Sequence, residues 1–141
     1  SGTIELHQAR LWAKDLPPQA RDRRVFGAIH WHGDGKSIVD DLDALRTGMI
    51  TPTLHAAVFV GGKVLETLGP LPGIVDEHRR FRASAPHRPA FLLGLADGAA
   101  ADLIAAGTTA DLDPLIATEL AKTHDPDFAT ALIVAELCNE A

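Results

Sequence analysis

The chain has 141 residues, of which 46% are hydrophobic and 23% charged, and a net charge of −6 at pH 7. This length can bury a substantial core, so we expect a single domain over residues 1–141. The sequence has no run of about 18 apolar residues, which predicts no membrane span and no membrane partner. Residues 101–141 contain eight acidic residues and one basic residue, and this acidic region argues against nucleic-acid binding, which needs a basic surface.

The number of cysteines in the sequence indicates the cellular compartment of the protein. Cys138 is the one cysteine of the chain, so no internal disulfide can form. Structural disulfides belong to oxidising compartments, and a chain without them is typical of a reducing one. We therefore expect a cytoplasmic protein.

The first fifty residues contain the clearest pattern in the chain. Thr3–Trp12 is predicted to be extended, because its apolar positions make a poor helical stripe. Pro17 and Pro18 interrupt any regular element, and Gln19–Arg24 is predicted to be a polar loop or a solvated helical turn. Val25–Met49 then predicts a strand, a glycine-rich turn and a helix, and the predictions about function depend mainly on this stretch.

Two histidines of the predicted strand share one of its faces. Side chains alternate between the faces of a strand, so His30 and His32 are neighbours with Cα atoms roughly 6.5–7 Å apart. Imidazole suits zinc, copper, iron and nickel, and Asp34, two residues after His32, can add an oxygen ligand. The sequence thus predicts a site for a divalent transition metal such as Zn at His30, His32 and Asp34. The alternative is that both histidines are hydrogen-bonded residues of a half-buried face and bind nothing.

The turn and the helix start that follow predict an anion site. Gly33 and Gly35 permit positive φ and close approach of a ligand to the backbone, and a helix N-terminus attracts anions. With Lys36 and Ser37 they predict a site for a phosphate or carboxylate. The spacing is not that of a P-loop, which needs glycine where His30 stands. The alternative is that the glycines only shape the turn.

The helix of this stretch has its own start and stop signals. Ser37 is predicted to be the N-cap, with Asp40 three residues later as a weak capping-box partner. Apolar residues recur on one helical face, at Ile38, Leu42, Leu45 and Met49. Gly48 is predicted to end the helix.

Strands and helices alternate through the middle of the chain. Buried strands are predicted over Thr53–Val60 and Ala90–Ala96. Val64–Leu68 is predicted to form a hairpin with the first of them. Helices are predicted over Ile74–Ala83 and Ala99–Ala106.

Two further helices are predicted from a shared start signal. Asp113-Pro114 and Asp125-Pro126 each place a carboxylate at the N-cap and a proline at the first helical position. The last helix is apolar beyond one stripe: Phe128, Ala131, Leu132 and Ala135 form the stripe, and Ile133, Val134 and Leu137 lie outside it. Such a helix is buried on more than one side, so we expect a homo-oligomer or a protein partner bound through it.

These elements predict an α/β fold with a small, mainly parallel or mixed sheet flanked by helices, ending in two or three C-terminal helices. Ligands of such sheets bind at the carboxyl ends of strands, which is where the turn after His32 lies. The favoured function is a non-catalytic domain that binds a small anionic ligand or a protein partner. The alternative is a small metal-dependent hydrolase that uses His30 and His32 for the metal, with Asp40 or Asp41 as the base.

Overall fold

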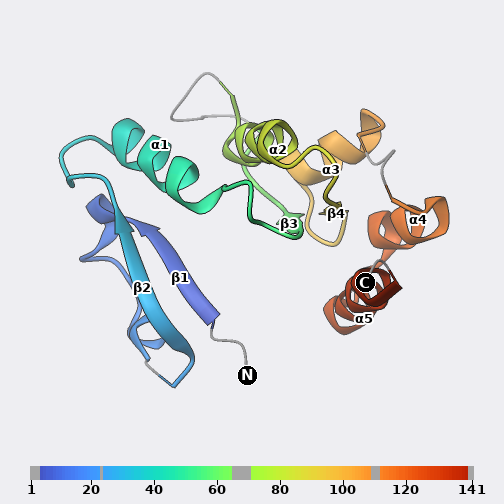
Figure 1. Cartoon of the computed structure of the whole chain (residues 1–141), viewed down its shortest axis with the longest axis horizontal. Coiled ribbons are helices and arrows are strands. Elements are labelled where there is room, and N and C mark those ends of the chain that lie inside the picture. The colour runs from blue at the N-terminus through green and yellow to red at the C-terminus, as the bar shows by residue number, and fades with distance from the viewer. Residues whose placement is uncertain (1–3, 23, 65–70, 109–111, 140–141) are drawn as a thin grey trace. The chain divides into compact units, whose positions relative to one another are not determined.

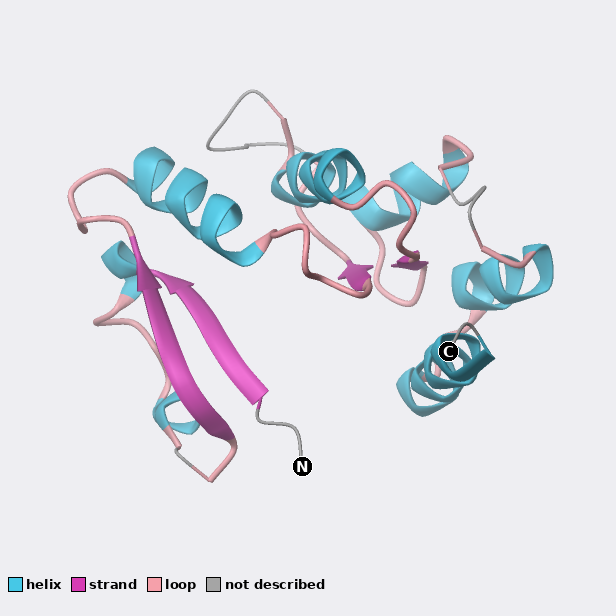
Figure 2. Cartoon of the chain, in the orientation of Figure 1, coloured by secondary structure: helices cyan, strands magenta, loops and turns pink. Residues whose placement is uncertain are grey.

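The computed structural model describes residues 4–22, 24–64, 71–108 and 112–139. The chain divides into two compact units, residues 1–51 and residues 52–141, and each is described by itself. Within the described residues, each unit contains one two-stranded parallel sheet with helices (Figures 1 and 2). The predicted α/β fold with parallel strands and C-terminal helices is thereby confirmed.

The first unit is a parallel strand pair followed by a helix. Its elements are β1 (Ile4–Ala9), two short 3₁₀ helices (Arg10–Trp12 and Pro18–Arg21), β2 (Phe26–His32) and α1 (Ile38–Met49). Parallel neighbours cannot be joined by a tight hairpin, and the segment with the two 3₁₀ helices makes the crossover. The extended structure predicted for Thr3–Trp12 is confirmed over Ile4–Ala9 as β1, but it is wrong for Arg10–Trp12, which forms a 3₁₀ helix.

The register of β1 against β2 decides which side chains meet. An irregularity between Ile4 and Glu5 shifts the pairing, so that Ile4 lies opposite Phe26 but Glu5 lies opposite Ala28. From there the pairing is regular, and His7 lies opposite His30. Side chains of paired residues in a sheet project from the same face. This shift therefore brings Glu5 and His7 onto the face of the sheet that carries the histidines of β2.

Helix α1 begins as predicted but ends differently. The Ser37 side chain accepts a hydrogen bond from the Asp40 N–H at 3.4 Å. The prediction that Gly48 ends the helix is wrong, because α1 continues to Met49. Gly48 lies in the last turn instead, where a Cβ would overlap the ring of His32. Glycine is needed there for close packing of the helix on the strand.

The second unit is a parallel pair with four helices. Its elements are β3 (Ala57–Val60), α2 (Gly73–Ser84), β4 (Ala90–Leu93), α3 (Ala99–Ala105), α4 (Pro114–Lys122) and α5 (Pro126–Asn139). The two Asp-Pro helix starts are confirmed: Asp113 accepts hydrogen bonds from the N–H groups of Leu115 and Ile116, and Asp125 from those of Asp127 and Phe128. The predicted hairpin strand at Val64–Leu68 falls mostly outside the described residues.

The two strands of this unit differ in burial. All four residues of β4 are buried, as predicted, but the strand ends at Leu93 and does not continue to Ala96. The predicted strand at Thr53–Val60 is shorter, because pairing with β4 starts at Ala57, and Phe59 is its one buried residue. The main core cluster of buried residues comprises Phe91, Leu93, Leu112, Leu120, Ala129 and Ile133, so β4, α4 and α5 share this core. No helix in the described part of the chain is long and apolar enough to span a bilayer.

Candidate functional site

Three imidazole rings form a cluster on one face of the β1–β2 sheet. The ring of His7 is nearly parallel to those of His30 and His32, with centroid distances of 4.6 and 5.1 Å and interplanar angles of 20° and 16°, and it stacks on the ring of His30. The Nδ1 of His7 and the Nε2 of His32 are 2.9 Å apart and share a hydrogen bond. The predicted common face of His30 and His32 is present, and His7 from the neighbouring strand contacts both rings.

Two rings of this cluster, those of His7 and His32, favour the neutral form. Burial lowers the pKa of His7, and the nearby rings of His30 and His32 lower it further, against the opposing effect of Glu5. Burial and the charge of His30 also lower the pKa of His32. A neutral imidazole has one nitrogen that can accept a hydrogen bond or bind a metal. The site thus supplies metal-competent nitrogens near neutral pH.

The carboxylate of Glu5 lies beside the imidazole of His30 in this cluster. The Nε2 of His30 lies 3.1 Å from an Oε atom of Glu5, and the two side chains are 43% and 51% exposed. Glu5, His7 and His30 each offer a ligand atom, and these atoms all lie within 4.8 Å of one another. The sequence prediction missed Glu5 and His7. Their Glu-x-His spacing repeats the i, i+2 pattern of the two histidines on β2, but pairing of the strands cannot be derived from spacing.

The third predicted ligand, Asp34, lies beyond the strand in the turn. Its carboxylate forms an ion pair with Lys36 at 2.9 Å and accepts a hydrogen bond from the Lys36 N–H. These contacts lower the pKa of Asp34, chiefly through the Lys36 side chain. Among the described residues, the group with metal-ligand geometry contains His30 but neither His32 nor Asp34.

The turn after β2 wraps around a buried carboxylate. Asp41 is fully buried, and one of its oxygens accepts hydrogen bonds from the N–H groups of Asp34 and Gly35 at 2.9 and 3.1 Å. The other oxygen accepts the Leu11 N–H at 2.8 Å. A side chain at Gly33 would overlap this carboxylate. The Asp41 carboxylate thus occupies the turn and links it to the 3₁₀ helix Arg10–Trp12 that follows β1. We call this set of hydrogen bonds the Asp41 clasp.

The residues predicted for anion binding are therefore placed close together but already have internal partners. Lys36 contacts Asp34, and Ser37 caps α1. Gly33 and Gly35 both have positive φ, of 85° and 81°. Of the two acids suggested as a base, Asp40 is exposed at the start of α1, and both oxygens of Asp41 accept backbone N–H groups.

A pocket of about 410 Å³ lies on the opposite face of the same sheet. It is lined by Arg10, Ala13, Arg21, Ile29 and Trp31. The Nε of Arg10 donates to the Gly33 carbonyl at 2.9 Å, and a terminal nitrogen of Arg21 donates to the Ala13 carbonyl at 2.7 Å. These backbone contacts position two arginine side chains in the lining of the pocket that Trp31 also lines, and Arg10 in addition contacts the glycine turn.

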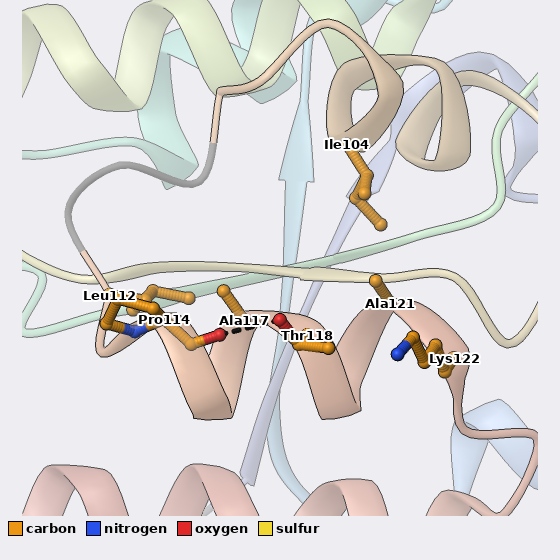
Figure 3. A pocket seen from close by; sticks show the side chains of 7 residues that line it. All are labelled: Ile104, Leu112, Pro114, Ala117, Thr118, Ala121 and Lys122. Atoms are coloured by element: carbon orange, nitrogen blue, oxygen red, sulfur yellow. Dashed lines mark hydrogen bonds between the residues drawn. The ribbon is translucent and has the colours of Figure 1, made fainter.

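A second pocket, of about 480 Å³, lies in the other unit between α3 and α4 (Figure 3). It is lined by Ile104, Leu112, Pro114, Ala117, Thr118, Ala121 and Lys122. The Thr118 hydroxyl donates to the Pro114 carbonyl at 2.7 Å, so it serves its own helix. Lys122 is the one charged residue of this lining, and the pocket lacks the convergent polar groups that orient a small ligand.

Comparison with models of protein families assigns this chain to a family. The model of the SLOG cluster2 family matches residues 12–138. No curated protein and no solved structure matches the chain. Because the family match covers most of the sequence, this protein belongs to the SLOG cluster2 family, which indicates a ligand-binding domain.

Proposed function

We propose that this domain binds a nucleotide or a nucleotide-derived anion and does not transform it. The family suggests a nucleotide-binding domain of the SLOG type. The observation that carries the proposal is the pocket in which Arg10, Arg21 and Trp31 converge. Its volume lies in the range of small-molecule sites, roughly 300–1,000 Å³.

The lining of this pocket suits the parts of a nucleotide. A guanidinium group carries five N–H donors and binds phosphate oxygens in a bidentate manner. The indole of Trp31 offers a flat apolar surface on which a base can stack, a contact worth roughly 1–3 kcal/mol. Arg10 and Arg21 would therefore hold the phosphate, and Trp31 the base.

The glycine turn supports this assignment by its position. The turn follows the carboxyl end of β2, which is the usual ligand-binding edge of a parallel sheet. A Cβ built at Gly35 would contact the side chain of Arg10 at 3.5 Å, so Arg10 lies directly against the turn. In this proposal Gly33, Gly35, Lys36 and Ser37 border the phosphate subsite, while Asp41 fixes the shape of the turn.

Tryptophan fluorescence tests the proposal. The chain contains two tryptophans, so a Trp12→Phe variant leaves Trp31 as the reporter. Mononucleotides with one to three phosphates should quench its emission saturably, and the matching nucleosides should bind more weakly. Arg21→Gln should weaken nucleotide binding about 10- to 100-fold, the value of one charge-assisted hydrogen bond.

A matched control is available on the surface of the second unit. Arg79 is exposed on α2, and Arg79→Gln makes the same change of charge and shape outside the pocket. Equal affinities of the Arg21→Gln and Arg79→Gln proteins would contradict the proposed site. Absence of saturable quenching by any nucleotide would contradict the proposed ligand class.

We also propose that the protein self-associates through α5. Phe128 and Val134 on this helix are 43% and 53% exposed, whereas Ile133 belongs to the core. Phe128 and Val134 lie six positions apart on different sides of α5, so apolar side chains are exposed on more than one side of this helix, and a second copy of the chain would cover them. Val134→Asp should therefore lower the mass measured by light scattering without unfolding the protein. Val39→Asp on α1, where the valine is 50% exposed, is the control. A wild-type protein that is monomeric at micromolar concentration would contradict self-association.

A further inference from the structure

The face of the β1–β2 sheet opposite the Arg10–Trp31 pocket carries a second, independent constellation. Its members are the side chains of Glu5, His7 and His30, with His32 as a hydrogen-bonded neighbour of His7. We propose that Glu5, His7 and His30 bind one divalent transition-metal ion, with Zn²⁺ as the ion of choice. This proposal does not depend on nucleotide binding.

The distances are close to those that a metal requires. Zinc binds imidazole nitrogen and carboxylate oxygen at about 2.0–2.2 Å, which places ligand atoms of a tetrahedral site about 3.4 Å apart. The ligand atoms of the three residues lie within 4.8 Å of one another, and the Glu5–His30 pair is already at 3.1 Å. Closure therefore needs side-chain adjustments of an ångström or so. Glu5 and His30 can make them because their side chains are about half exposed.

The backbone beneath the three residues is fixed by the sheet. The register places His7 opposite His30, and the shift at Ile4–Glu5 places Glu5 one pair earlier on the same face. Ligands on two paired strands are held more precisely than ligands on loops, since a sheet limits movement of each Cα atom. The predicted ligand Asp34 lacks this support because it lies in the turn and is paired with Lys36.

His32 lies where it can orient the imidazole ring of the proposed ligand His7. Metal-ligating histidines usually engage their second ring nitrogen with a hydrogen-bond partner, which fixes the tautomer and the orientation of the ring. His32 provides such a partner for His7 at 2.9 Å. The ring of His32 is in turn confined by α1, because it fills the space that a side chain at Gly48 would need.

The chemistry of the donor set selects the metal. Two imidazoles and one carboxylate suit zinc and its first-row neighbours better than the hard ions Mg²⁺ and Ca²⁺, which prefer oxygen ligands. Three protein ligands leave a fourth position of a tetrahedral site for water or for a ligand atom. The partly exposed position of the cluster keeps that fourth position accessible.

Metal titration of the full chain without a histidine tag tests the inference. Calorimetry with Zn²⁺ should give one site per chain, and Co²⁺ should give the visible spectrum of a tetrahedral complex. Glu5→Gln and His7→Gln should each weaken Zn²⁺ binding at least 10- to 100-fold, since loss of an outer partner alone typically has that effect. Circular dichroism of each variant establishes that it is folded.

Asp34→Asn is the matched control for Glu5→Gln. Both changes replace one partly exposed carboxylate by its amide, but Asp34 lies outside the proposed ligand set. Asp34→Asn should leave Zn²⁺ affinity within about twofold of the wild type. The inference would be overturned if the wild type bound no Zn²⁺, if folded Glu5→Gln and His7→Gln proteins bound it as tightly as the wild type, or if Asp34→Asn caused the loss.

Discussion

The two strand pairs described in this protein are both parallel, but they differ in how far their side chains are buried. In the β3–β4 pair, every residue of β4 is buried, and Phe91 and Leu93 belong to the core cluster. In the β1–β2 pair, Ala9 is the one buried residue of the thirteen in the two strands. One face of that pair carries the histidine cluster, and the other carries the arginine and tryptophan pocket.

The difference shows what burial does to function. A strand whose side chains are all enclosed contributes stability, because its residues contact only the interior. A strand pair left half-exposed can keep polar side chains ionisable and accessible to ligands. In the described residues, the side chains of both proposed binding sites lie on or beside the less buried pair.

The largest expected effect concerns the core of the second unit. Phe91 is fully buried on β4, while Val58, on the adjacent strand, is 51% exposed. Phe91→Ala should reduce the free energy of unfolding by about 3–5 kcal/mol, and Val58→Ala by less than about 0.5 kcal/mol. Urea unfolding monitored by circular dichroism checks both. Similar losses in the two variants would show that the burial contrast within this sheet does not govern its stability.

The next effect concerns the clasp of the first unit. Asp41 accepts three backbone N–H groups, whereas its neighbour Asp40 is exposed. Asp41→Ala leaves buried donors without their acceptor, so we expect a loss of about 2–4 kcal/mol. Asp40→Ala should change stability by less than about 1 kcal/mol. Hydrogen exchange at Leu11, Asp34 and Gly35 should accelerate in the Asp41 variant alone, and unchanged exchange would contradict the clasp.

The smallest effect concerns pH. The pKa values of His7 and His32 are lower in the folded protein than the usual 6.5, mainly through burial. The unfolded chain therefore takes up protons first as the pH falls, so stability decreases as the pH falls from 6.5 toward the lower pKa of the folded state. Unfolding of the chelator-treated protein at pH 7.5 and 5.5 should show this decrease. A double variant with His7→Gln and His32→Gln should show a smaller decrease, and an equal one would contradict this origin.

Local patterns in the sequence determined much of the fold. Ser37, Asp113 and Asp125 were identified as helix caps because capping depends on residues within one turn of the helix. The apolar run at β4 predicted a buried strand, because a run of that kind is stable in water only when enclosed. The common face of His30 and His32 followed from strand geometry alone. The single domain over residues 1–141 and the cytoplasmic location stay predictions.

Tertiary structure determined which residues from distant parts of the sequence contact one another at the histidine cluster and in the glycine turn. The sequence cannot reveal that His7 contacts the rings of both His30 and His32, because the register of β1 against β2 depends on a one-residue shift at Ile4–Glu5. It also cannot reveal that Asp41 fills the glycine turn, since the Leu11 N–H that completes this arrangement lies thirty residues away. Contacts between distant residues are set by packing of whole elements, and no local propensity encodes them.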